Sequence, residues 1–147
     1  MSDAMRRLLD SLYTDAMLLA DEARAYFESI GRDERDGLDP LLRVAFSCES
    51  LKITTRLMHV VAWLLTRRGV DAGELSAAEA LARAHRLGES PCSELVVLAA
   101  MPPGAAELVA RSEALHRRAA ALDGALADDF AAPSGARFLQ DRLAAFF

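Results

Sequence analysis

The stretch from Leu41 to Arg68 constrains the fold most, because it contains neither glycine nor proline. At about 100° per residue, its apolar residues form two stripes along a helix and leave the charged residues on the remaining side. The first stripe consists of Leu42, Phe46, Ile53, Leu57, Val60 and Leu64. The second consists of Val44, Leu51, Met58, Val61 and Leu65. This pattern predicts a central helix with two neighbours and a solvated side made of Glu49, Lys52, Arg56, His59 and Arg67.

Two other segments supply those neighbours. Residues 4–30 follow the spacing of an amphipathic helix, and Gly31 stands where a left-handed cap is expected. A third helix starts at Pro102-Pro103 and runs to about residue 123. It has a coiled-coil-like seam, formed by Leu108, Leu115 and Leu122. The fold class is therefore all-α, an antiparallel three-helix bundle, in which this seam and the second stripe serve the core or a dimer interface.

The connections between these helices differ in length and composition. Residues 31–38 form a charged linker, Asp39 caps the central helix, and Gly69 closes it. A capping box at residues 76–79 predicts a short extra helix over residues 77–86 in the second connection. The apolar run at residues 94–100 fits more than one structure and is left open.

The domain organisation follows from a change of composition near the C-terminal end. Residues 1–126 form the three-helix bundle domain, and residues 127–137 contain the Pro, Ser, Gly and Asp residues of a hinge. The part from 127 to 147 is therefore predicted to be a flexible C-terminal helix or tail with an amphipathic end.

Composition excludes several classes of function. A net charge of −5 argues against a general nucleic-acid binder. The sequence shows neither a signal peptide nor an apolar run of the ~20 residues that a membrane span needs, so we expect a cytoplasmic protein. Cys48 and Cys92 are isolated, and Cys48 is expected to be a small core residue. No catalytic, cofactor or metal motif occurs, which predicts a protein that is not an enzyme.

Two sets of residues are candidates for binding. The apolar residues of the tail share one side of a short helix and either dock on the bundle or bind a partner protein; they are Phe138, Leu139, Leu143, Phe146 and Phe147. The row of Lys52, Arg56 and His59, near Glu49, is interpreted as an exposed charged face or a dimer rim. An anion-binding or catalytic site is the remote alternative for this row.

Two segments resemble the alphaproteobacterial family of RcdA, the regulator of CtrA degradation. One is the run from Glu49 to Met58 with Val61-Ala62-Trp63-Leu64-Leu65 after it. The other is in the third helix and comprises Met101-Pro102-Pro103, Leu108, Arg111-Ser112, Leu115 and Leu122-Asp123. The resemblance covers the chain from the first helix to Asp123.

This resemblance implies a dimeric three-helix bundle without enzymatic activity. Members of the family act as adaptors for the protease ClpXP and deliver cell-cycle regulators once CpdR, a response-regulator-like factor, has primed the unfoldase. They also work with PopA, which responds to cyclic di-GMP. We therefore expect a homodimeric cytoplasmic adaptor, with the cell pole as a candidate location. The competing hypothesis is an interaction or localisation scaffold that engages no protease.

Overall fold

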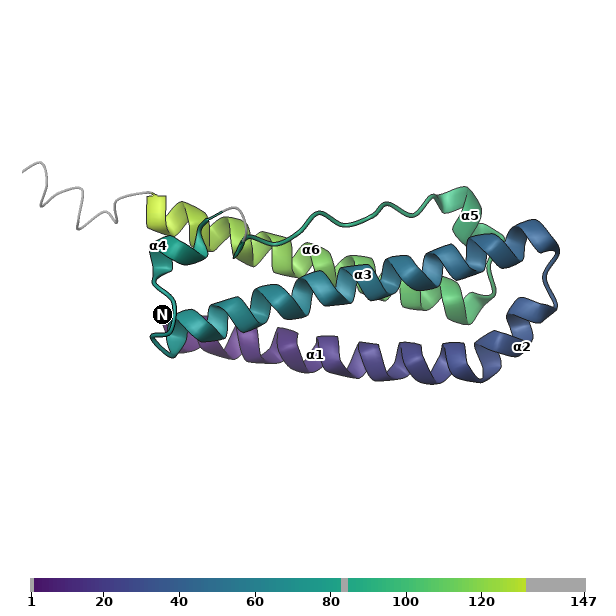
Figure 1. Cartoon of the computed structure of the whole chain (residues 1–147), viewed down its shortest axis with the longest axis horizontal. Helices are drawn as coiled ribbons and strands as arrows, with labels where there is room; N and C mark the ends of the chain where they lie inside the picture. The colour runs from purple at the N-terminus through teal and green to yellow at the C-terminus, as the bar shows by residue number, and fades with distance from the viewer. Residues whose placement is uncertain (1, 83–84, 132–147) are drawn as a thin grey trace, which may run out of the picture.

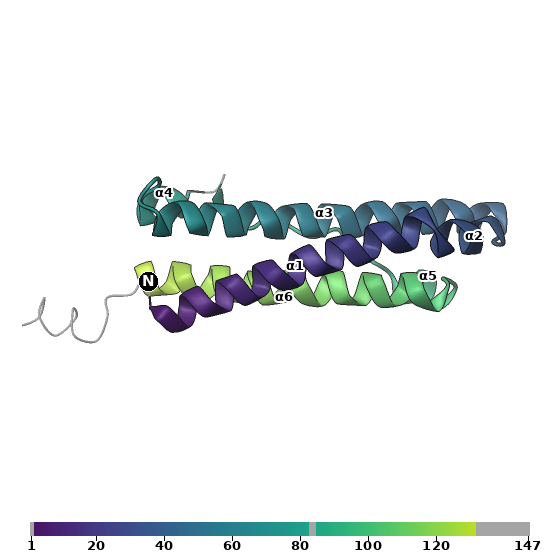
Figure 2. The ribbon, with the colours of Figure 1, turned by 90° about the horizontal axis from the view of Figure 1, so that it is seen from below.

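Three long helices lie side by side in the computed structural model, which describes residues 2–82 and 85–131 (Figure 1). They are α1 (Asp3–Glu28), α3 (Pro40–Asp71) and α6 (Pro103–Ala131). Helix α1 crosses diagonally over the other two (Figure 2). The prediction of an all-α bundle of three long helices, with a short extra helix in the second connection, is confirmed.

The directions of the helices differ in one respect from the predicted antiparallel order. Helix α1 is antiparallel to α3, as the ion pair between Arg6 and Asp71 shows. Helices α3 and α6 instead run in the same direction, because Arg56 contacts Ser112 and Trp63 contacts Asp123. The second connection returns the chain along the length of the bundle between α3 and α6 (Figure 1), which explains why it is too long for a simple turn.

The predicted linker at residues 31–38 is largely a helix, α2 (Ile30–Asp36). Gly31 is helical and is not a left-handed cap. Its role is close packing, because a Cβ atom at Gly31 would lie 2.8 Å from Cε1 of Tyr26, and one at Gly104 of α6 would lie 2.8 Å from Cε2 of the same ring. The ring of Tyr26 is thus held between two glycines.

Helix α3 begins where the sequence predicts and ends later. The Asp39 carboxylate accepts a hydrogen bond from the Leu42 N–H at 3.0 Å, as an N-cap does. The helix continues through Gly69, and the left-handed residue is Gly73, with φ at 77°. The N–H of Glu74 donates to the Gly69 carbonyl at 2.9 Å, and this closes a Schellman motif.

In the part of the second connection that the structure describes, two short α-helices lie on either side of an extended segment. Ser76 caps α4 (Ala77–Ala80) as predicted, although this helix is shorter than residues 77–86. Residues 85–94, here called the strap, then run along α3 and α6 to α5 (Leu95–Ala99) (Figure 1). The apolar run left open by the sequence is therefore mainly helical, and the side chains of Leu95 and Val96 are exposed.

The core lies between the three long helices and extends to an aromatic cluster at one end. The first stripe of α3 faces it, with Phe46, Ile53, Leu57, Val60 and Leu64 buried. On α6, the seam residues Leu108 and Leu115 are buried and Leu122 packs against them, so this seam belongs to the core. The ring centroids of Phe27 and Phe46 are 5.4 Å apart in an edge arrangement.

Helix α6 continues through Gly124 to Ala131. Residues 127–131, predicted to begin a hinge, are therefore helical. The tail residues proposed for binding lie outside the described residues, namely Phe138, Leu139, Leu143, Phe146 and Phe147. The domain boundary at residue 126 stays a prediction. Within the described ranges, no helix combines the length and hydropathy needed to cross a membrane, and no three potential metal ligands gather at one point.

Ionisation of Tyr26 is predicted to destabilise the bundle at alkaline pH. Burial, together with a hydrogen bond donated to Glu34, raises the pKa of the Tyr26 phenol above its ordinary value of 10.0. Since the folded state favours the neutral phenol, its stabilisation is fully present below pH 10 and is lost as pH rises above it. We expect the urea concentration at the unfolding midpoint to decrease as the pH rises above 10. The Tyr26→Phe variant should lack the part of this decrease that comes from ionisation of the phenol. An equal decline in both proteins would contradict this explanation.

Candidate functional site

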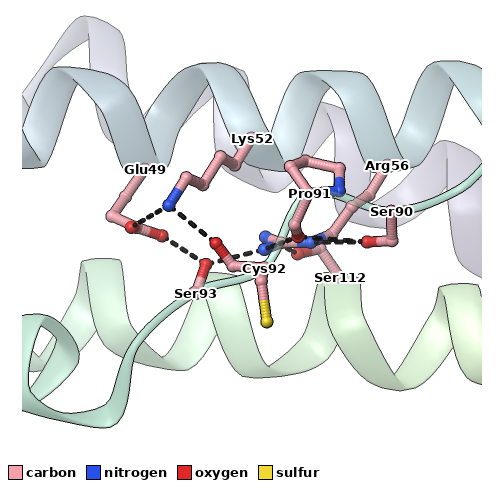
Figure 3. A network of polar contacts seen from close by, with 8 residues as sticks. All are labelled: Glu49, Lys52, Arg56, Ser90, Pro91, Cys92, Ser93 and Ser112. Atoms are coloured by element: carbon pink, nitrogen blue, oxygen red, sulfur yellow. Dashed lines mark hydrogen bonds and ion pairs between the residues drawn. The ribbon is translucent and has the colours of Figure 1, made fainter.

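The polar side of α3 was predicted to be solvated, but the second connection covers it, with α4 over Arg67 and the strap over the rest. Glu49 and Arg56 are 2% and 0% exposed, and Arg67 is also buried. Lys52 and His59 are half-buried. The prediction that Lys52, Arg56 and His59 form an exposed binding row is therefore wrong for Arg56. The row instead faces the strap, as Figure 3 shows for Lys52 and Arg56 and the approach of Gly88 shows for His59.

Arg56 joins the strap to both parallel helices. Its Nε donates to Ser90 Oγ at 3.1 Å, and its Nη2 donates to the Pro91 carbonyl at 2.8 Å and to Ser93 Oγ at 2.6 Å. Its Nη1 donates to Ser112 Oγ on α6 at 3.2 Å. A guanidinium holds its N–H donors in a fixed planar fork, so one side chain fixes three strap residues at once.

Glu49 and Lys52 complete this network (Figure 3). Ser93 Oγ donates to Glu49 Oε2 at 2.6 Å, and Lys52 Nζ donates to Glu49 Oε1 at 3.1 Å and to the Cys92 carbonyl at 2.7 Å. Glu49 is therefore paired with Lys52, and the buried guanidinium of Arg56 is satisfied by hydrogen bonds to neutral groups. Because the donors of Arg56 and Lys52 already serve the strap, the arrangement favours structural anchoring over anion binding.

A second cluster holds the beginning of the strap. The Asp123 carboxylate accepts from Trp63 Nε1 at 3.0 Å and from Arg86 Nε at 2.8 Å. Arg67 lies over the Trp63 ring, with its guanidinium carbon 5.9 Å from the centroid, and donates to the Ala80 carbonyl at 3.1 Å. Burial lowers the pKa of Arg67. Together these contacts fix the end of α4 against α3 and the beginning of the strap against α6.

Histidines and a glycine fix the middle of the strap. His116 Nε2 lies 2.8 Å from the Gly88 carbonyl. A Cβ atom at Gly88 would lie 2.9 Å from His59 Nδ1, so only glycine allows this approach. His59, which was expected on the solvated side, and His116 are both half-buried under the strap.

The second apolar stripe of α3, in contrast, faces solvent. Val44, Leu51, Met58 and Leu65 are between 53% and 67% exposed, and Val61 is half-buried. Cys48, expected in the core, is exposed beside them. The surface here called the α3 face consists of Val44, Ser47, Cys48, Leu51, Thr54, Thr55, Met58, Ala62 and Leu65. None of these residues is charged, which is unusual for an exposed helix surface.

An apolar groove of about 600 Å³ lies between α1 and α3 beside this face. Phe27 and Val61 line it, and Arg24 and Glu28 of α1 supply the charged groups of its lining. Met58, Ala62 and Leu65 belong both to the groove and to the α3 face. The two surfaces are therefore continuous, and their chemistry is that of a protein interface.

Sequence reasoning identified part of this surface and missed the network. The residues of the second stripe were assigned to a core or dimer seam, and the structure leaves most of them free for an interface. Ser90, Ser93 and the pair of Trp63 with Asp123 were not recognised as structural anchors. The strap has no periodic pattern, so only the absence of charge on the α3 face could have indicated which side of the helix is exposed.

Comparisons with known proteins agree with this architecture. The family model described as protein of unknown function (DUF1465) matches residues 1–147. The crystal structure of RcdA from Caulobacter crescentus CB15 is 32% identical, with a TM-score of 0.67. The match covers 86% of this chain and 92% of that one. No curated protein matches the chain.

Proposed function

We propose, from the premise that this chain belongs to the DUF1465 family and is similar to RcdA, that it is a non-enzymatic adaptor for regulated proteolysis. In this role it tethers cell-cycle regulators to a ClpXP-type protease, with CpdR-like and PopA-like factors as further partners. The observation that carries the proposal is the uncharged α3 face with its adjoining groove. The charged residues of α3 support it, because they hold the strap and do not surround an open pocket.

An adaptor needs little more than suitable surfaces. Holding cargo near the unfoldase turns a second, weak contact into an intramolecular one, so modest interfaces are sufficient. The chain offers the α3 face and, in its sequence, the amphipathic end at residues 138–147. We assign self-association to the α3 face and contact with cargo or a priming factor to the tail. A cytoplasmic location, at or near the cell pole, belongs to this proposal.

The tail assignment is tested by degradation of cargo in a reconstituted system with the full chain. The triple variant Phe138→Ser, Leu143→Ser and Phe147→Ser is expected to lengthen the half-life of the cargo about tenfold, the effect of losing roughly 1.4 kcal/mol of contact. The matched control replaces Leu8 and Leu18, which are exposed on α1, by serine. Equal delivery by the triple variant and the control would remove the tail from the mechanism.

A scaffold that engages no protease is the alternative, because an uncharged apolar face suits many protein partners. Two measurements, capture from native cytosol and the half-life of cargo, separate the adaptor from the scaffold. Capture from native cytosol should recover the unfoldase together with regulators if the chain is an adaptor. Recovery of regulators without the unfoldase, combined with no effect of the full chain on cargo half-life, would favour the scaffold.

A further inference from the structure

The groove between α1 and α3, of about 600 Å³, has the length and the apolar lining that an amphipathic helix requires. Its α3 side extends from Ser50 to Leu65, a distance of about 22 Å along the helix axis. Met58 lines it from α3, and Ala20 and Phe27 line it from α1. The groove therefore has room for the apolar side of a helix of about three turns.

A segment of the chain outside the described residues has the matching pattern. Leu139, Leu143 and Phe146 stand at positions i, i+4 and i+7, the spacing with which an amphipathic helix places its anchors in a groove. A phenylalanine beside each end of this row extends the same apolar side. As a helix, residues 138–147 would be about 15 Å long, which is within the length of the groove.

The end of α6 lies close enough to the groove for this segment to reach it. Helix α6 ends at the end of the bundle where α1 begins (Figure 1). Phe130 of α6 and Val70 of α3 line one cavity there, and Val70 is about 7.5 Å along α3 from Leu65, the near end of the groove. Residues 132–137 can span about 20 Å, so they bridge this distance.

The cavity beside Phe130 is a less suitable site for the segment. It is smaller, about 440 Å³, and Arg67 and Asp129 contribute charged groups to its lining. It also adjoins the end of α6, so a segment bound there would not need the spacer of residues 132–137. The length of the spacer therefore favours the groove.

We propose that residues 138–147 dock as a helix in the groove between α1 and α3 of their own chain, and that a partner displaces them. Because Met58, Ala62 and Leu65 belong to both the groove and the α3 face, the docked segment also covers part of that face. Displacement thus frees the segment and this part of the face together. The inference rests on the proposed function, in which the same segment contacts cargo or a priming factor.

The opposing contributions to the free energy make this docking reversible. Burial of the apolar side chains favours the docked state, whereas ordering residues 132–147 costs conformational entropy. The tether holds the segment near the groove at a millimolar effective concentration, so a weak contact is sufficient. A partner that binds the segment more tightly than the groove does will therefore release it.

Thiol modification of the full chain tests the docking. In a background of Cys48→Ser and Cys92→Ser, which removes both native thiols, Ala20→Cys places a single thiol in the groove. Ala20 is half-buried and is not part of the α3 face, and cysteine is a small residue that such a position accepts. The rate at which N-ethylmaleimide modifies this thiol measures how often the groove is open.

The variant Leu139→Ser, Leu143→Ser and Phe146→Ser is expected to leave the groove open. With the wild-type segment, modification should be about tenfold slower than in this variant, the ratio for an effective concentration of about 1 mM and a contact with a Kd of about 0.1 mM. A synthetic peptide of residues 135–147, added to the variant at about 1 mM, should slow the reaction again.

Leu18→Cys in the same background is the matched control, because Leu18 is exposed on α1 outside the groove. Its thiol should react at one rate with either form of the segment. Equal rates for Ala20→Cys with and without the serine substitutions would overturn the inference. Protection that increases with protein concentration would assign the groove to a second copy. Protection of Val70→Cys and not of Ala20→Cys would place the segment in the cavity beside Phe130.

The inference and the proposed function can fail separately. Thiol modification measures docking without cargo, whereas the degradation assay measures delivery of cargo. A chain that delivers cargo but leaves Ala20→Cys unprotected would keep the adaptor proposal and remove the docking. A chain that protects Ala20→Cys but has no effect on cargo half-life would keep the docking and remove the adaptor proposal.

Discussion

Replacing Arg56 by alanine is expected to lower the free energy of unfolding by about 3–5 kcal/mol, because several buried polar groups lose their donor at a cost of about 1–3 kcal/mol each. Arg56 is fully buried, and its loss leaves the Pro91 carbonyl and the hydroxyls of Ser93 and Ser112 without their donor. A domain of this size is stable by only about 5–15 kcal/mol, so the change should be plain in urea unfolding followed by circular dichroism.

Two further variants define what Arg56 contributes. Arg56→Lys retains the charge but not the planar fork, so it should lose about 1–3 kcal/mol, the cost of unsatisfied buried groups. Arg43→Ala, an exposed position on the same helix, should stay within about 0.5 kcal/mol of wild type. If Arg56→Ala unfolds like Arg43→Ala, the strap is not held by this side chain.

Replacing Trp63 by alanine should cost about 3–5 kcal/mol, as large aromatic deletions in cores do. Trp63 is 2% exposed and packs in the main core. Its indole N–H also donates to Asp123, which in turn accepts from Arg86 at the start of the strap. The deletion therefore leaves a cavity and an under-satisfied carboxylate, measurable as a lower urea midpoint.

Trp63→Phe separates packing from hydrogen bonding. It keeps most of the ring in the core and removes the indole N–H, so a loss of about 1–2 kcal/mol is expected. Leu8→Ala, at an exposed site, provides the reference for a neutral change. A loss in Trp63→Phe as large as that in Trp63→Ala would mean that the hydrogen bond to Asp123 dominates.

Local signals predicted the long helices and their beginnings. The caps at Asp39 and Ser76 are made by side chains that bond to nearby backbone groups, so a few residues of sequence determine them. The glycines misled the prediction of helix ends. Gly31 and Gly69 lie inside helices, and Gly31 is explained by packing against Tyr26, which no local pattern contains.

Which side of α3 is exposed depends on the strap, a segment whose sequence has no periodic pattern. An extended strap brings backbone carbonyls, such as that of Pro91, against the bundle, and these need donors. Arg56 and Lys52 meet that need, so residues that hydropathy assigns to solvent are covered. Burial of that side leaves Leu51 and Met58 outside. The prediction that α3 has two neighbouring helices was right. The second of these neighbours, α6, does not pack against the second apolar stripe of α3.

The strap also gives the chain an order of assembly. Helices form locally within about a microsecond, but the strap bonds of Arg56 span 34 to 37 residues and the bond to Ser112 spans 56. We therefore expect the strap to settle after α3 and α6 have come together in parallel, because it contacts both helices. By the same logic it is the part that can open while the three helices stay packed. The strap is thus expected to be the last part of the described chain to fold and the first to open.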